Sequence, residues 1–165
     1  MDLTFRQATP DDWPAIWPIF RAVVATRETY PYPPETSEHD ARDLWMQPND
    51  GRRFTFVAES DHEIVATAYL KPNQPGLGDH VCNAGWMVAP EVSGRGIGRR
   101  FAEYVIDKAR AAGFHAMQFN AVVASNERAV ALWESLGFEI VGTVPAAFRH
   151  GTEGLTPIHV MYREL

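Results

Sequence analysis

The sequence is poor in cysteine, in long apolar runs and in basic charge. Its one cysteine, Cys82, excludes an internal disulfide and fits a reducing compartment. No apolar run approaches the roughly 18 residues of a membrane-spanning helix, so we expect no membrane partner. The formal net charge of −6 argues against broad nucleic-acid binding, so nucleic acid is not an expected partner. The N-terminal residues lack a basic region followed by an apolar core, so we predict a cytoplasmic protein without a signal peptide.

The length and composition fit one domain. The chain has 165 residues, of which 45% are hydrophobic and 22% charged, as is usual for a globular protein with a real core. No internal repeat, low-complexity segment or linker divides it. We therefore predict a single domain over residues 1–165, with no metal site.

Hydrophobic periodicity predicts a strand, two helices, three strands, a helix, a strand, a helix and two strands, in that order. The predicted helices cover residues 11–27, 37–47, 97–112 and 126–136. The predicted strands cover residues 3–6, 54–59, 63–71, 80–88, 116–123, 139–144 and 158–163, and residues 145–157 are predicted to be a long loop. This order predicts an α/β (α+β) fold, in which a mixed sheet has helices on both faces. The strand–helix–strand unit at residues 80–123 predicts a parallel pair of strands, with a ligand where the pair separates.

The stretch Val88–Gly98 connects the end of a predicted strand to the start of a helix. Its glycines stand at alternate positions: Gly94, Gly96 and Gly98. Glycines allow a ligand to approach the backbone closely, and N–H groups at a helix N-terminus favour negative charge. Full positive charges are added by Arg95, Arg99 and Arg100. We interpret this stretch as the site for the pyrophosphate of coenzyme A.

Two stretches resemble the GNAT superfamily of acyl-CoA N-acyltransferases. Trp86–Gly98 is similar to the acetyl-CoA loop of that family, and Ser125–Phe138 is similar to its second cofactor motif. Together with the order of elements, the resemblance covers essentially the whole chain. It implies the GNAT fold, which is a mixed, mostly antiparallel seven-stranded sheet with a splayed parallel strand pair. It also implies acetyl-CoA as acyl donor, direct attack by an amine in a ternary complex, and a possible homodimer.

The resemblance also implies which residues contact acetyl-CoA. They are the strand residues Trp86, Met87 and Val88, the loop residues Ser93, Gly94, Arg95, Gly96, Ile97, Gly98 and Arg99, and Asn126 and Trp133. The backbone N–H of Val88 is expected to bind the thioester oxygen, which makes it a catalytic contact. Asn126 is either a helix N-cap or a hydrogen-bond partner of the pantetheine chain, and both roles are compatible.

Two residues depart from the family pattern. Ser93 stands where the family usually has Arg or Gln, but backbone N–H groups still serve the pyrophosphate. Trp133 stands where the family often has a Tyr that protonates the departing thiolate. An indole N–H donates a hydrogen bond without giving up its proton, so that proton donor is missing. A CoA thiol, with a pKa of about 8.5, is nevertheless a fair leaving group.

The spacing of Asn83, Asn120 and Asn126 further resembles that of small amino-acid N-acetyltransferases. Among them are fungal enzymes that acetylate proline analogues such as azetidine-2-carboxylate. Asn83 is either a turn or bulge residue, or a catalytic residue that positions the substrate, alone or with a water. Asn120 is either a satisfied core asparagine or a catalytic donor to the carboxylate or amine of the substrate, because asparagine is depleted in strands.

Three further residues are candidates for binding the acceptor. Tyr30 and Tyr32 lie in a proline-rich stretch that is either a stiff connector or a rigid wall over a pocket. Arg149, in the predicted loop, is either exposed or binds a substrate carboxylate through its paired N–H groups. We predict a small-molecule amine as acceptor, namely an amino acid or an analogue of one. The alternatives are a peptide or protein amine, and a non-catalytic acyl-CoA sensor.

Overall fold

The structure is a computed structural model that describes residues 2–165. Seven strands form one sheet: β1 (Leu3–Gln7), β2 (Phe54–Ser60), β3 (Glu63–Pro72), β4 (Val81–Val88), β5 (Ala116–Val123), β6 (Glu139–His150) and β7 (Gly154–Glu164). Four α-helices accompany it: α1 (Trp13–Ala25), α2 (Glu38–Trp45), α3 (Ile97–Ala111) and α4 (Glu127–Ser135). Short 3₁₀ turns lie at Pro10–Asp12, Gly76–Gly78 and Pro90–Val92. The predicted order of helices and strands is confirmed.

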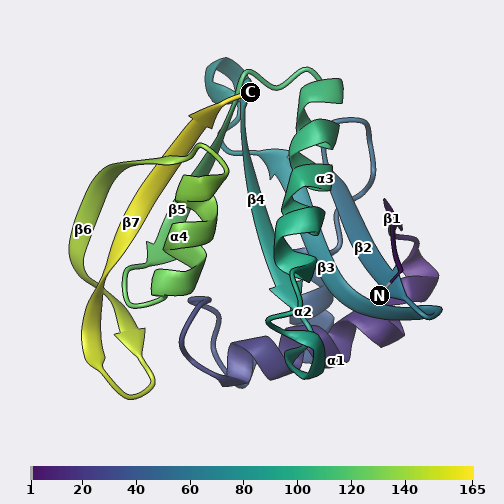
Figure 1. Cartoon of the computed structure of the whole chain (residues 1–165), viewed down its shortest axis with the longest axis horizontal. Coiled ribbons are helices and arrows are strands. Elements are labelled where there is room, and N and C mark those ends of the chain that lie inside the picture. Colours follow the sequence, from purple (N-terminus) through teal and green to yellow (C-terminus); the bar gives the residue numbers. More distant parts are fainter. Residues whose placement is uncertain (1) are drawn as a thin grey trace.

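The sheet has the strand order β1-β2-β3-β4-β5-β7-β6, and β4–β5 is its parallel pair (Figure 1). Every other neighbouring pair is antiparallel. β4 and β5 are in register at Val81 with Ala116 and at Cys82 with Met117, after which the ladder ends. The two strands therefore diverge toward their carboxyl ends, as the splayed pair in the predicted fold requires.

Helices cover both faces of the sheet and bury two apolar clusters against it (Figure 1). On one face, α3 buries Ile97, Phe101 and Val105 at helical spacing, and α4 packs Leu132 against the same cluster. On the other face, α1 and α2 enclose Trp45, which is fully buried. The diverging ends of β4 and β5 thus lie between two helical layers.

The predicted long loop at residues 145–157 is wrong, because β6 and β7 continue through most of it as a hairpin with a short turn at residues 151–153. Proline cannot donate to a ladder, so it is not expected within a regular central strand. Pro145 and Pro157 instead lie at an irregularity between two paired positions, Val144 with Ile158 and Phe148 with Thr156. Ala146 adopts a φ of 51° there. A bulge in an edge strand accommodates prolines that a regular central strand would not.

Candidate functional site

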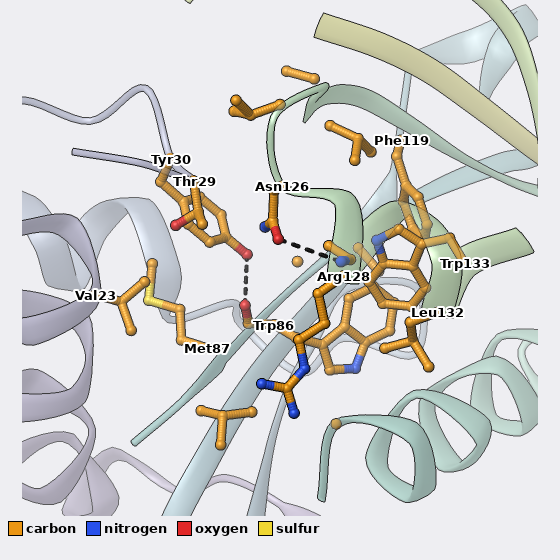
Figure 2. Close-up of a pocket in the computed structure, with 18 of the residues that line it drawn as sticks. Val23, Thr29, Tyr30, Trp86, Met87, Phe119, Asn126, Arg128, Leu132 and Trp133 are labelled. Atoms are coloured by element: carbon orange, nitrogen blue, oxygen red, sulfur yellow. Dashed lines mark hydrogen bonds between the residues drawn. The ribbon is translucent and has the colours of Figure 1, made fainter. Parts of the chain in front are cut away.

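A cavity of about 590 Å³ lies where β4 and β5 diverge. Ligand pockets commonly have volumes of about 300–1,000 Å³. Its walls come from the end of α1 and the segment after it, from β4 and β5, from the glycine loop, and from α4 (Figure 2). The cavity therefore passes through the fork in the sheet and connects its two faces. This is the location predicted for the ligand.

Asn83 lies at the closed end of the fork. Its side-chain Oδ1 accepts a hydrogen bond from the Tyr69 hydroxyl at 2.9 Å, and its Nδ2 donates to the Gln118 carbonyl at 2.9 Å. Asn83 pairs with Lys71 within the regular β3–β4 ladder, so the turn or bulge alternative is wrong. The residue is 7% exposed and lines the cavity. It bridges β4 to β5 one residue beyond the last paired positions, where main-chain bonds no longer hold the strands together.

Gly85 lets two tyrosines pack directly against β4. A Cβ atom at this position would stand 2.6 Å from Cε1 of Tyr69 and 3.0 Å from the Tyr30 hydroxyl oxygen. A close backbone approach, and not a bulge, is the reason for a glycine inside this strand. The wall of the cavity beside β4 is therefore built from tyrosine rings.

The glycine loop forms the opposite wall. Gly94 and Gly96 have φ angles of 86° and 78°, which L side chains rarely adopt, and α3 begins immediately after at Ile97. Predicted cofactor residues that line the cavity are Trp86, Met87, Val88, Ser93, Gly94, Gly96, Ile97, Gly98, Arg99, Asn126 and Trp133. Arg95 is exposed and lies outside the lining. This wall combines helix N-terminal N–H groups with positive charge, as a bound pyrophosphate needs.

The free edge of β4 presents backbone groups to the fork. The Ala89 N–H donates to the Val65 carbonyl across the β3 side, at 2.8 Å. Because successive residues of a strand turn their N–H groups to opposite edges, the N–H of Val88 points toward the fork. That is the direction expected for the donor to a thioester oxygen.

Arg128 lines the same wall and was not predicted from the sequence. Its Nη2 atom lies 3.2 Å from the position that a Cβ of Gly94 would take, so the side chain reaches from α4 across to the glycine loop (Figure 2). The sequence does contain an indication that Arg128 meets an anion. An arginine in the first turn of a helix is unfavourable, because its charge opposes the helix dipole. An anionic ligand nearby would offset this unfavourable interaction.

Asn126 caps α4, since its Oδ1 accepts from the Ala129 N–H at 3.3 Å, and it also lines the cavity.

Trp133, which stands where the family often has a tyrosine, packs in an aromatic group. Its ring centroid lies 4.8 Å from that of Trp86 and 4.6 Å from that of Phe119. The indole Nε1 of Trp86 is buried and has no hydrogen-bond partner among the described residues.

Tyr30 and Tyr32 form the wall on the α1 side. Their rings stack with centroids 5.6 Å apart, and the Tyr30 hydroxyl donates to the Trp86 carbonyl at 2.8 Å (Figure 2). Burial raises the pKa of Tyr30 well above its usual value and also raises the pKa of Tyr32. Both line the cavity as neutral phenols, so the alternative of a mere connector does not describe this segment.

Asn120 lines the cavity but is exposed, so the alternative of a core asparagine is wrong. Its Nδ2 donates to Oδ1 of Asn73 at 2.7 Å, and its Oδ1 accepts from Nε2 of Gln118 at 3.1 Å. The β5–β7 register shifts between Phe119 and Val122, which turns Asn120 and the next residue out of the simple alternation. Arg149 is exposed on β6 and does not line the cavity.

The described residues that line the cavity include no carboxylate, histidine, lysine or cysteine. Their titratable side chains are Tyr30, Tyr32, Tyr69, Arg99 and Arg128. Burial also raises the pKa of Tyr69. The positive charge is confined to the glycine-loop and α4 wall, and the opposite wall with Tyr30, Tyr32 and Asn83 is polar but uncharged.

Two features are absent from residues 2–165, the part of the chain that the structure describes. No helix there combines the length and the apolarity that crossing a membrane requires. No group of three or more histidine, cysteine, aspartate or glutamate side chains is arranged there to hold a metal ion.

Comparison with known proteins identifies the family. The sequence model of the Acetyltransferase (GNAT) family matches residues 17–138. N-acetyltransferase aca1 of Schizosaccharomyces pombe is 37% identical over 98 residues, which cover 59% of this chain and 47% of that protein. Protein SPT10 of Saccharomyces cerevisiae is 25% identical over 113 residues, which cover 68% of this chain and 17% of SPT10. The chain thus spans about half the length, or less, of these curated relatives.

Solved structures agree in fold. A GCN5-related N-acetyltransferase from Kribbella flavida superposes with a TM-score of 0.94 at 49% identity, covering 99% of this chain and 98% of that one. A phosphinothricin acetyltransferase from Sinorhizobium meliloti, solved with acetyl-CoA, gives a TM-score of 0.89 at 22% identity. The match covers 100% of this chain and 89% of that one. The similarity therefore extends over the whole chain. On the family model and this fold, the chain belongs to the GNAT family of acetyl-CoA-dependent N-acetyltransferases.

Proposed function

We propose that this protein transfers the acetyl group of acetyl-CoA to the amine of a small molecule, an amino acid or an analogue of one. One observation carries the proposal: a single cavity joins an anion-binding loop on one face of the fork to a tyrosine and asparagine wall on the other. Two substrates held in one cleft react by direct attack, and proximity supplies much of the rate. The cytoplasmic location and a homodimer remain predictions.

On the donor side, the geometry of the cavity supports the following roles. N–H groups of the glycine loop, with Arg99 and Arg128, bind the pyrophosphate of acetyl-CoA. The Val88 N–H stabilises the developing oxyanion, because it points into the fork. Arg95 binds the phosphates only from the rim, since it lies outside the lining.

On the acceptor side, Asn83 and Asn120 hold the amine and carboxylate of the substrate, and Tyr30 and Tyr32 shape the space around it. These side chains line the cavity together. The spacing of the asparagines supports an amino-acid acceptor of the proline-analogue type. Arg149 is exposed on β6 and lies outside the lining, so we assign it no contact with the acceptor.

Thiol release from acetyl-CoA, measured with a panel of amines, tests the proposal. The panel contains amino acids, cyclic imino acids, the matching amines without a carboxylate, and peptides. We expect turnover with one or more amino acids or their analogues. Turnover confined to peptides would indicate that the acceptor is a peptide or protein amine. Tight CoA binding without turnover on any amine would instead indicate an acyl-CoA sensor.

The pH dependence of kcat/KM is expected to follow the acceptor amine. Only the neutral amine attacks, and the tyrosines of the cavity stay protonated because their pKa values are raised. The rate therefore rises with pH and levels off above the pKa of the amine. Two acceptors whose amine pKa values differ by about 2 should give midpoints that differ by the same amount. A midpoint that stays constant when the acceptor changes would reveal a titrating group of the enzyme.

Replacement of Trp133 by phenylalanine is expected to change kcat by less than about threefold, since indole does not supply a proton to the thiolate. The aromatic packing with Trp86 and Phe119 is largely retained by the smaller ring. Steady-state kinetics with saturating acetyl-CoA measures the change. Trp133→Leu, which removes the aromatic ring, serves as the packing control. A loss of 100-fold or so in Trp133→Phe alone would show that the indole N–H assists departure of the thiolate.

A further inference from the structure

A chain of three side-chain amides lies on the acceptor side of the fork. Nε2 of Gln118 donates to Oδ1 of Asn120 at 3.1 Å, and Nδ2 of Asn120 donates to Oδ1 of Asn73 at 2.7 Å. Asn120 is exposed and lines the cavity, so a ligand can reach its amide. Gln118 and Asn73 are not part of the lining. The two outer amides therefore act on a ligand through Asn120.

The main chain holds both outer amides in place. Asn73 follows β3, and its N–H donates to the Val81 carbonyl at the start of β4, at 2.8 Å. Its side chain reaches past β4 to β5 (Figure 1). Gln118 lies in the β5–β7 ladder, and its carbonyl accepts from Nδ2 of Asn83 at 2.9 Å. Gln118 thus contacts both predicted acceptor asparagines, one through its main chain and the other through its side chain.

The direction of the hydrogen bonds determines what Asn120 offers to a ligand. A side-chain amide has two N–H donors and an oxygen with two lone pairs. In Asn120 the chain uses one N–H and one lone pair, which leaves one of each. A hydrogen bond accepted at the oxygen polarises the amide, so the remaining N–H becomes a stronger donor.

The charges of the cavity indicate which substrate group this N–H meets. Arg99 and Arg128, the cationic residues of the lining, belong to the glycine-loop and α4 wall. A carboxylate on the acceptor side must then be bound by neutral donors. The free N–H of Asn120 is an accessible donor of this kind.

We propose that Gln118 and Asn73 are positioning residues that orient the Asn120 amide so that its free N–H donates to the carboxylate of the amino-acid acceptor. This inference rests on the proposed function and names the chemistry of its acceptor subsite. Reversal of the amide would exchange the free N–H and the free lone pair. Repulsion between two oxygens would then replace a charge-assisted hydrogen bond.

The test uses Asn73→Asp and Gln118→Glu, which are matched in charge. Each variant adds one carboxylate beside the Asn120 amide and keeps the length of the side chain. In Asn73→Asp the new carboxylate accepts from Asn120 as the amide oxygen does, so the direction of the chain is kept. In Gln118→Glu the new carboxylate cannot donate, so the Asn120 amide must reverse to give it an N–H.

Steady-state kinetics measures the KM for the best amino acid of the panel. The added charge raises this KM in both variants. We expect Gln118→Glu to raise it roughly 10-fold more than Asn73→Asp, because only Gln118→Glu loses a hydrogen bond to a charged group. For the same amine without its carboxylate, and for acetyl-CoA, the two variants should have equal KM values. Their Tm values should also agree, since the amides of the chain are not buried.

Equal amino-acid KM values in the two variants, with an active wild type, would overturn this inference and leave the proposed function intact. A larger increase in Asn73→Asp would contradict it as well, because the chain would then run in the opposite direction. The same difference for the amine without a carboxylate would show that Asn120 contacts another group. A lower Tm in Gln118→Glu alone would indicate a structural role and count against the proposal. Absence of thiol release by the wild type on every amine would overturn the proposed function itself.

Discussion

Replacement of Gly96 by valine is expected to weaken binding of acetyl-CoA by about 100-fold, since it removes charge-assisted hydrogen bonds from the loop to the pyrophosphate. Gly96 has a φ of 78° and immediately precedes α3. A β-branched residue resists this conformation, so the loop must shift and its N–H groups lose their common direction. Isothermal titration calorimetry with CoA measures the change.

Gly113→Val is the matched control. Gly113 has a φ of 86°, follows the other end of α3, and like Gly96 has nothing within 4 Å of a Cβ position. Both variants therefore introduce similar backbone strain, worth about 1–3 kcal/mol, and should lower Tm similarly. Only Gly96 lines the cavity. Equal losses of CoA affinity in the two variants would mean that the loop acts through stability and not through contact.

Replacement of Asn83 by alanine is expected to lower kcat by about 100-fold, because the fork between β4 and β5 loses the side chain that bridges it and positions the acceptor. The Tyr69 hydroxyl and the Gln118 carbonyl both lose their partner. Two buried groups left without hydrogen bonds should also lower the free energy of unfolding by about 2 kcal/mol. Steady-state kinetics and urea denaturation measure the two effects.

The control variant Thr67→Val separates the loss of stability from the loss of kcat. The Thr67 hydroxyl is also buried between two partners, accepting from Nε1 of Trp45 at 2.9 Å and donating to the Phe56 carbonyl at 3.2 Å. It does not line the cavity, so its loss should cost similar stability and leave kcat near wild type. If Asn83→Ala has wild-type kcat, Asn83 serves the fold alone.

The site was predictable where one continuous stretch of chain forms it. The stretch Val88–Gly98 contains the end of a strand, the glycines and the start of a helix. These local features place N–H groups at a helix N-terminus whatever the rest of the fold is. Arg128 was missed because its proximity to Gly94 depends on the packing of α4 beside α3. Arg149 was predicted to lie in a loop, whereas it lies in an edge strand whose bulge accommodates the neighbouring prolines.

The sequence by itself determined the order of helices and strands, the glycine loop between β4 and α3, and the family, because each depends on residues close together in the chain. Only the tertiary structure decided how Asn83 is used, since its partners, Tyr69 and Gln118, lie on different strands. It also decided which polar atoms remain unpaired, among them the Thr29 hydroxyl. Whether a buried group has a partner depends on every segment that packs around it, and no local pattern of residues records that.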